Sequence, residues 1–321
     1  MTNEQINMIK TAAKDCGCRC DENILLSGFT TFGIGGKCPL MIEVNGEESL
    51  KTLLPMMNDI PFYVIGKGSN LLISDRDIDM IFLHMGRDIS SISLNGNCLT
   101  CGAGASLSLA GTFAKNNSLT GLEFAYGIPG NIGGAVYMNA GAYGGEMKDI
   151  VQSVRAVDYL GNAHEFSAEE LDFGYRHSKF CGGGYIITEA TLRLAHGDMD
   201  EISAKMAELT AKRKEKQPLE YRSAGSTFKR PQGTFAALLI EQCGLKGYSC
   251  GAAQVSEKHS GFVINKGGAS FDEVHVMDFR YFEGDLPTYC TEHGITDVLF
   301  AVNEMAVNTE QHQNSIRAMF N

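Results

Sequence analysis

The sequence predicts an α+β fold divided into three parts. A strand, a glycine-rich loop and a second strand at 62–75 follow a helix pattern, which is a βαβ-like arrangement. From about 80 to 195 the pattern changes to short strands separated by polar and glycine turns. A long helix pattern at 198–216 then leads into a mixed segment. We therefore predict parts with the bounds 1–79, 80–197 and 198–321.

Two helices are expected in the first part, before and after a strand. Apolar residues within 3–15 recur at the spacing of one helix face, so a short amphipathic helix is expected there. Residues 40–44 are rich in Leu, Met, Ile and Val and predict a strand. Residues 47–57 partly follow the helical period.

The second part is predicted as a succession of short strands with one helix. Asn95-Gly96 is a strong hairpin signal, because both residues tolerate the positive φ that a tight turn needs. Residues 185–194 alternate as in a half-buried strand. Further strands are expected at 81–83, 89–94, 98–102, 151–159 and 163–166, and the helix at 106–116.

The third part opens with the helix at 198–216, which has an apolar face. Lys212-Arg213-Lys214 lie on this helix, and we interpret them as a solvated charged face rather than as nucleotide contacts. Residues 233–243 predict a second helix and 261–265 predict a buried strand.

Composition and charge restrict the class of protein. Of the 321 residues, 44% are hydrophobic and 20% are charged, as in an ordinary globular protein. The net charge of −11 argues against non-specific binding to nucleic acid or to an anionic membrane surface. No apolar run approaches the roughly 18 residues of a membrane span, and the N-terminus lacks a secretory pattern, so a cytoplasmic protein is expected.

The ten cysteines are expected to be free thiols, as is usual in a reducing compartment. Cys16, Cys18 and Cys20 are closely spaced and could suggest a metal. They lack the second, distant pair that a structural zinc site uses, so we interpret them as part of a connecting segment and predict no metal.

The stretch at 121–145 carries the clearest functional signal, since it is rich in glycine and has Glu123 as its one charged residue. Ile128-Pro129-Gly130 predicts a turn. Gly133 and Gly134 are expected to leave backbone N–H groups uncovered, and a helix starting there would add its positive dipole end. The stretch could bind a pyrophosphate, or it could be a tight structural loop.

A second glycine-rich loop follows the predicted strand at 62–65. Gly66 and Gly68 permit an anion-binding nest, and Ser69 and Asn70 add side-chain donors. The spacing fits neither the dinucleotide fingerprint nor the phosphate loop of nucleotide hydrolases. Two separate loops of bare backbone suit a large cofactor that contains a diphosphate.

Six segments carry the motifs of a known family. They are TFGIGG at 31–36, IGKGSNLLISD at 65–75, GIPGNIGGAVYMNAGAYGGE at 127–146, YRHSKF at 175–180, SAGSTFKRP at 223–231 and GLKGYSCGAAQVSEKHSGFVINKGGAS at 244–270. In this order they resemble the UDP-N-acetylenolpyruvoylglucosamine reductases, the MurB family of flavoproteins. The resemblance covers about residues 20–275.

The resemblance implies a two-subdomain FAD-binding domain of the vanillyl-alcohol-oxidase (PCMH) type, followed by a smaller α+β substrate-binding domain. It implies a reductase of peptidoglycan synthesis that converts UDP-N-acetylglucosamine enolpyruvate to UDP-N-acetylmuramate with NADPH. The shorter branch of the family fits, because the insertion that covers the substrate in the other branch is missing. A monomer without nucleic-acid or membrane partners is expected.

The expected FAD contacts follow the matching motifs. They are Thr31, Gly33, Ile65, Gly66, Lys67, Gly68, Ser69, Asn70, Leu71, Gly127, Ile128, Pro129, Gly130, Ile132, Gly133, Gly134, Ala135, Asn139, Gly141 and Ala142. No His or Cys lies immediately before the turn at 128–134, where some related oxidases attach the flavin, so FAD is expected to be noncovalent.

The resemblance also implies three catalytic residues. Arg176 would stabilise the enolate beside the substrate carboxylate, and its alternative role is a structural salt bridge. Ser226 would donate the proton, and its alternative role is a turn residue. The third is a glutamate that the family carries in a Pro-Glu pair. No such pair follows Gly294-Ile295, so Glu304 is the nearest candidate and Glu292 another.

Basic residues near Ser226 are the expected substrate contacts. Lys216, Lys229 and Arg230 suit the UDP diphosphate or the sugar, although each could be ordinary surface charge. Two other functions stay open: a related FAD oxidoreductase that acts on a small alcohol or hydroxy acid, and a flavin-binding protein whose irregular C-terminus impairs catalysis.

Overall fold

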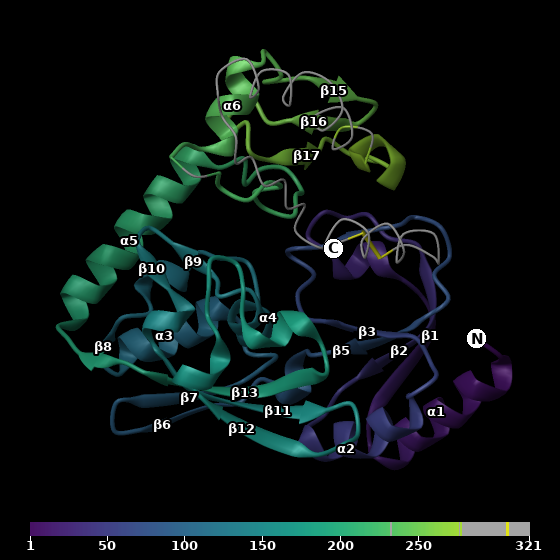
Figure 1. The fold of residues 1–321 in the computed structure, drawn as a ribbon. Helices are drawn as coiled ribbons and strands as arrows, with labels where there is room; N and C mark the ends of the chain where they lie inside the picture. The colour runs from purple at the N-terminus through teal and green to yellow at the C-terminus, as the bar shows by residue number, and fades with distance from the viewer. Residues whose placement is uncertain (232, 276, 278–305, 308–321) are drawn as a thin grey trace. The chain divides into compact units, whose positions relative to one another are not determined.

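The computed structural model describes residues 1–231, 233–275, 277 and 306–307 (Figure 1). They form two compact units. The first comprises Met1–Ile24, Cys38–Lys67 and Asp79–Arg213, and the second comprises Leu25–Lys37, Gly68–Ile78 and the described residues from Lys214 onward. Two early segments of the chain therefore pack with its C-terminal part. The division into 1–79, 80–197 and 198–321 rests on the sequence pattern and stays a prediction.

The first unit contains two main sheets. The four-stranded sheet has the order β1 (Arg19–Leu25), β2 (Lys37–Glu43), β5 (Ile81–His84) and β3 (Phe62–Ile65). Both β2 and β3 pair with β5 in parallel. The five-stranded antiparallel sheet has the order β12 (Ala163–Ser167), β11 (Val151–Asp158), β13 (Tyr185–Arg193), β7 (Cys98–Gly102) and β6 (Ile92–Asn95). Short pairs join β9 (Gly141–Ala142) to β10 (Gly145–Glu146), and β8 (Leu119–Thr120) to β14 (Ala195–His196).

The first unit also contains helices. They are α1 (Asn3–Asp15), α2 (Glu47–Met56), α3 (Leu107–Asn116), α4 (Ile132–Tyr137) and α5 (Met199–Lys216), whose last three residues belong to the second unit. The helix α2 packs against α1 and β11, and α4 packs against β13 and β7 (Figure 1). Short 3-10 helices lie at Leu26–Phe29, Arg87–Ile89, Glu123–Ala125, Met147–Asp149, Ala168–Leu171 and Lys179–Gly182.

The second unit is smaller and mixed. It contains β4 (Leu72–Ile73), α6 (Ala236–Gln242), β15 (Ser249–Cys250), β16 (Ala253–Val255), β17 (Val263–Asn265) and β18 (Ala306–Val307). The strands β15, β16 and β17 form an antiparallel sheet, and β18 pairs with β4 in parallel. Phe32 and Ile34 belong to the same core cluster as Phe228, Val263 and Phe271, which explains why the segment 25–37 packs here.

Local sequence signals account for most of these elements. Thr2 begins α1 with a capping box, in which its side chain accepts from Gln5 N and the Gln5 side chain accepts from Thr2 N. The hairpin β6–β7 turns at Gly96 with a φ of 61°, as the Asn-Gly pair predicts. The central strand β5 is fully buried from Ile81 to Leu83, which is typical of a parallel strand covered on both faces. The predicted α+β class is confirmed.

No helix within the described ranges is long and apolar enough to cross a membrane. The nine cysteines that the structure describes are free thiols, and the described part of the chain holds no cluster of three or more His, Cys, Asp or Glu suited to a metal ion.

Gly104 allows the close approach that supports the start of α4. A Cβ added there would lie 1.9 Å from the Gly86 carbonyl oxygen and 3.0 Å from that of Ile89. Its neighbours Ala103 and Ala105 accept backbone hydrogen bonds from the first residues of α4. The bare backbone at Gly104 therefore fixes the position of this helix.

Replacing Gly104 by Ala should lower the free energy of unfolding by about 2–4 kcal/mol, because backbone atoms must move to admit the methyl group. Urea unfolding followed by circular dichroism measures the loss. Gly182→Ala is the matched control, since an added Cβ there meets nothing within 4 Å. Equal effects of the two substitutions would contradict the packing argument.

Candidate active site

Arg176 lies in a tight turn of the first unit. Gly174 N donates to His177 O at 3.0 Å and His177 N donates to Gly174 O at 3.3 Å, so the two residues close the turn around Tyr175 and Arg176. Arg176 has a φ of 54°, in the left-handed region that a residue with a side chain adopts only at a cost. The turn thus holds the arginine backbone in one orientation.

The Arg176 guanidinium is anchored by neutral groups. Nη1 donates to Asn139 O at 3.3 Å and Nη2 donates to Gly141 O at 3.0 Å. Its carbon Cζ lies 5.1 Å from the centre of the Tyr175 ring. Within the described residues no carboxylate forms an ion pair with Arg176, so the structural salt bridge considered above is not what holds it. Its positive charge remains available to an anionic ligand.

Asn139 fixes the carbonyls that hold Arg176. Its side chain is fully buried, and Nδ2 donates to Glu146 Oε2 at 2.7 Å and to Gly174 O at 2.8 Å. Its Oδ1 accepts from Lys148 N at 2.9 Å. The amide is therefore bonded within the protein on both its atoms, and the predicted FAD contact of Asn139 stays a prediction.

The start of α4 differs in part from the expectation. Ile132 N donates to Ala105 O at 2.8 Å and Gly133 N donates to Ala103 O at 2.9 Å. The expectation of an uncovered N–H at Gly133 is therefore wrong, because a preceding strand end supplies a carbonyl that the local pattern did not reveal. Gly134 is exposed, and a Cβ added there meets nothing within 4 Å, so bare backbone is present at this one position.

Within the first unit, Gly66 at the start of the second glycine-rich loop lies next to the N-cap of α4. Asn131, at the N-cap of α4, donates from Nδ2 to Met85 O at 3.0 Å, and Met85 N donates to Ile65 O at 2.8 Å. A Cβ added at Gly66 would lie 3.4 Å from Asn131 Nδ2. The backbone of Gly66 thus lies beside the N-cap residue of α4, so the start of the second glycine-rich loop and the start of the helix are neighbours.

A buried ion pair supports the same edge of the parallel sheet. Glu43 ends β2 and His84 ends β5, and His84 Nδ1 lies 2.5 Å from Glu43 Oε2. Burial raises the pKa of Glu43, but the hydrogen bond and charge of His84 and the charge of Arg19 outweigh it and hold the pKa below its ordinary value. The carboxylate therefore stays ionised and fixes the strand ends that precede Met85.

Arg213 is buried next to Gly127, unlike the two lysines beside it in sequence. Lys212 and Lys214 are exposed, as predicted, but Arg213 is only 9% exposed, and its Nε would lie 2.9 Å from a Cβ at Gly127. Its Cζ lies 5.8 Å from the centre of the Tyr143 ring. Burial lowers the pKa of Arg213, yet an arginine remains charged at neutral pH. The prediction of a wholly solvated face is therefore wrong at this residue.

In the second unit, Thr31 connects two segments. Thr31 N donates to Gly68 O at 3.1 Å, and its Oγ1 donates to Ser223 O at 2.7 Å. Gly68 has a φ of 58°, and a Cβ there would lie 2.1 Å from Phe29 O, so only glycine fits. The loop that contains Ser69 and Asn70 and the segment before Ser226 are thus held on either side of Thr31.

Ser226 is exposed and its backbone is fixed. Ser226 forms a β-bridge with Phe262, and Thr227 N donates to Gly261 O at 2.9 Å. Gly225 has a φ of 84°, which gives the sharp approach to the serine. His259 lies beside this bridge, with its ring centre 5.0 Å from that of Phe262, and burial lowers its pKa.

The predicted substrate contacts lie in the second unit. Lys216 is exposed at the end of α5, and Lys229 is partly buried. Arg230 donates from Nε to Thr234 O at 3.4 Å, and its Cζ lies 4.0 Å from the centre of the Phe235 ring. Their contacts with a substrate stay a prediction. Glu304, like Glu292, lies outside the described residues.

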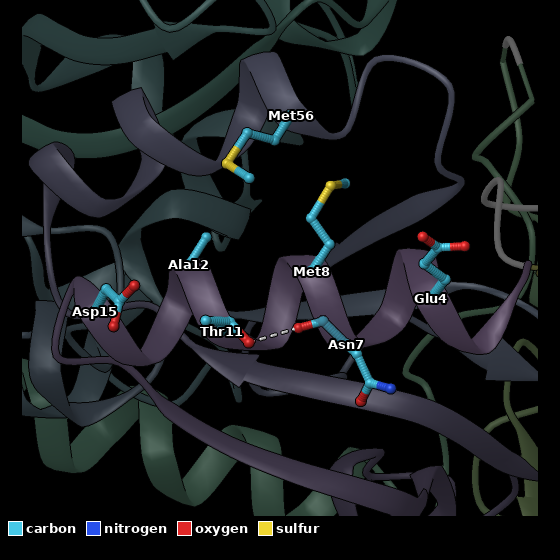
Figure 2. A pocket seen from close by; sticks show the side chains of 7 residues that line it. All are labelled: Glu4, Asn7, Met8, Thr11, Ala12, Asp15 and Met56. Atoms are coloured by element: carbon cyan, nitrogen blue, oxygen red, sulfur yellow. Dashed lines mark hydrogen bonds between the residues drawn. The ribbon is translucent and has the colours of Figure 1, made fainter.

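A pocket elsewhere on the first unit holds none of the predicted site residues. Figure 2 shows its lining, which comes from α1 and from Met56 at the end of α2. The lining residues are Glu4, Asn7, Met8, Thr11, Ala12, Asp15 and Met56.

Comparison with known proteins agrees with this arrangement. A family model described as "FAD binding domain" matches residues 39–167, and one described as "UDP-N-acetylenolpyruvoylglucosamine reductase, C-terminal domain" matches residues 217–277. The first spans both glycine-rich loops from Gly66 to Gly134, and the second contains Ser226.

Similar proteins carry the same name. The UDP-N-acetylenolpyruvoylglucosamine reductase of Clostridium novyi is 45% identical over 254 residues, which are 78% of this chain and 82% of that protein. That of Clostridioides difficile is 47% identical over 253 residues, 78% of this chain and 83% of that protein. The crystal structure of the Thermus caldophilus enzyme has a TM-score of 0.75 and 36% identity, and covers 83% of this chain and 96% of that chain. The chain belongs to the UDP-N-acetylenolpyruvoylglucosamine reductase family.

Proposed function

We propose that this protein is an FAD-dependent reductase that uses NADPH to convert UDP-N-acetylglucosamine enolpyruvate to UDP-N-acetylmuramate in peptidoglycan synthesis. The single observation that carries the proposal is the anchoring of Arg176 by two backbone carbonyls, without a carboxylate among the described residues. Family membership and the match to an FAD-binding domain support it. The enzyme would act as a monomer in the cytoplasm, with FAD held noncovalently.

Arg176 would stabilise the negative charge that develops next to the substrate carboxylate. When bound, FAD takes a hydride from NADPH and supplies it to the vinyl carbon of the enolpyruvyl group. The guanidinium keeps its charge at any working pH, and its planar fork matches a carboxylate. Because Arg176 already has its orientation in the free protein, little reorganisation is needed in the reaction.

Ser226 would supply the proton that completes the reduction. A serine hydroxyl is a weak acid, so this role requires close positioning and a partner that restores the proton. The bridge to Phe262 and the turn at Gly225 provide the positioning. Glu304 stays the candidate for the third catalytic residue. Lys216, Lys229 and Arg230 would pair with the anionic part of the nucleotide sugar.

An anaerobic titration of the purified flavoprotein tests the function. NADPH should bleach the visible band of oxidised flavin, and UDP-N-acetylglucosamine enolpyruvate should then restore it, because the two half-reactions share one cofactor. Bleaching without recovery would contradict the proposed substrate. A small alcohol or hydroxy acid that itself bleaches the flavin would favour the alternative oxidoreductase.

Changing Ser226 to Ala should slow the return of oxidised flavin by about 10²- to 10⁴-fold and leave the NADPH step nearly unchanged, because only the second step needs the proton. Stopped-flow absorbance separates the two steps. Ser249→Ala, an exposed serine of the same unit, is the control. A loss confined to the NADPH step would be evidence against the role of Ser226.

Changing Arg176 to Met should slow the same step by about 10²- to 10³-fold, because the developing charge loses its fixed cation. FAD content and melting temperature should stay close to those of the parent. Arg193→Met, an exposed arginine on β13, controls for the loss of one positive charge. Equal rates in the two variants would exclude a catalytic role for Arg176.

A further inference from the structure

Arg222 lies directly on the bare backbone of Gly33 in the second unit. A Cβ added at Gly33 would lie 2.3 Å from Arg222 Nη1 and 2.8 Å from its Cδ. Gly33 also has a φ of 71°, so a residue with a side chain is doubly disfavoured there. The arginine side chain therefore occupies the space that a side chain at 33 would take.

Hydrogen bonds hold the two segments around this contact. Asn265 N donates to Arg222 O at 2.8 Å, and Asn265 Nδ2 donates to Phe32 O at 3.0 Å. Thr31 Oγ1 donates to Ser223 O at 2.7 Å. Asn265 is only 6% exposed, so breaking its bonds would leave a buried amide unsatisfied. The backbone on both sides of Arg222 is thus fixed.

The described neighbours of Arg222 provide no ion pair for its charge. Its side chain is exposed, and among the described residues no carboxylate pairs with it. The acidic residue closest to it in sequence, Glu220, instead lies 3.5 Å from Lys258 Nζ. Arg76, another arginine of this unit, pairs with Asp272 at 3.8 Å. Arg222 is therefore a positioned cation whose N–H groups can donate hydrogen bonds to an anion.

The segments near Arg222 are among those predicted to bind a nucleotide. Thr31 N donates to the carbonyl of Gly68, in the glycine-rich loop, at 3.1 Å. Ser226 follows Arg222 by four residues on a fixed strand-like segment. Arginine binds phosphate oxygens in a bidentate manner, which suits a diphosphate better than a single neutral group.

We propose that Arg222 binds the diphosphate of a nucleotide that lies along residues 30–33. The proposal rests on the function proposed above, because FAD, NADPH and the UDP-sugar each carry this group. Arg222 acts as a binding residue, in addition to Lys216, Lys229 and Arg230. The glycine at 33 is needed so that the guanidinium can lie flat on the segment.

The first arm of the test uses the apoprotein. FAD is titrated by flavin fluorescence into the parent protein, Arg222→Met, Arg222→Lys and the control Arg76→Met, with riboflavin as the probe that lacks a diphosphate. If FAD is the ligand, Arg222→Met should weaken FAD binding by about 10- to 100-fold and leave riboflavin binding unchanged. Arg222→Lys should restore part of the affinity, and Arg76→Met should bind FAD as the parent does.

The second arm uses the FAD-loaded protein. The dissociation constants of NADPH and of UDP are compared with that of uridine, which lacks the phosphates. If the ligand is the nucleotide substrate, Arg222→Met should weaken NADPH or UDP binding about 10-fold or more while uridine binding and FAD affinity stay constant. Raising the salt concentration should reduce the difference between the parent and Arg222→Met.

The two arms together distinguish a diphosphate-binding role of Arg222 from a structural one. A loss confined to the diphosphate-bearing probes in either arm supports the proposal and identifies the nucleotide. Unchanged affinity in both arms, or equal loss for riboflavin and uridine, overturns it. If Arg222→Met fails to fold, Arg222→Lys gives the same comparison with the charge retained and the fork removed. Failure of the proposed function would appear in the parent protein as missing turnover, whereas these affinities are measured without turnover.

Discussion

The burial of the Asn139 amide is the constraint on which the catalytic geometry of the first unit depends. An amide taken out of water must find partners within the protein, and Asn139 finds them in Glu146, Gly174 and Lys148. These bonds fix the chain on both sides, including the carbonyls that receive Arg176. A cation that water would otherwise surround is thus held in one orientation by two backbone carbonyls, and no described carboxylate forms an ion pair with it.

Glycine serves close packing here at least as much as it serves contact with a ligand. The N–H of Gly133 is used by Ala103, and a methyl group at Gly133 would lie 2.9 Å from the Ala103 side chain. Gly127 and Gly33 each leave room for an arginine. Gly134 alone, in the start of α4, combines exposure with free space. A glycine-rich motif therefore contains some glycines that allow close packing and others that are open to a ligand. The local sequence does not distinguish the two kinds.

The sequence predicts secondary structure correctly where the signal comes from neighbouring residues. The capping box of α1, the Asn-Gly hairpin and the apolar run of β5 each depend on neighbours within a few residues. At Arg213 two local signals conflict. The helical spacing of Ile202, Met206 and Leu209 places it on the buried face of α5, whereas its charge favours a solvated face. The contact of Phe32 with the core of Phe228 has no local signal, because tertiary packing alone brings these residues together.

The hydrophobic core of the second unit is formed by segments that are synthesised far apart in time. Residues 25–37 and 68–78 leave the ribosome long before residues from 214 onward, which supply the rest of their core. Until then Phe32 and Ile34 lack the core residues that come from 228 onward and present apolar surface to the cell. Contacts between residues so far apart in sequence slow folding, because the entropy of closing a long loop is lost before the apolar side chains are buried. During synthesis this apolar surface is therefore exposed until the core residues between Phe228 and Met277 have been made.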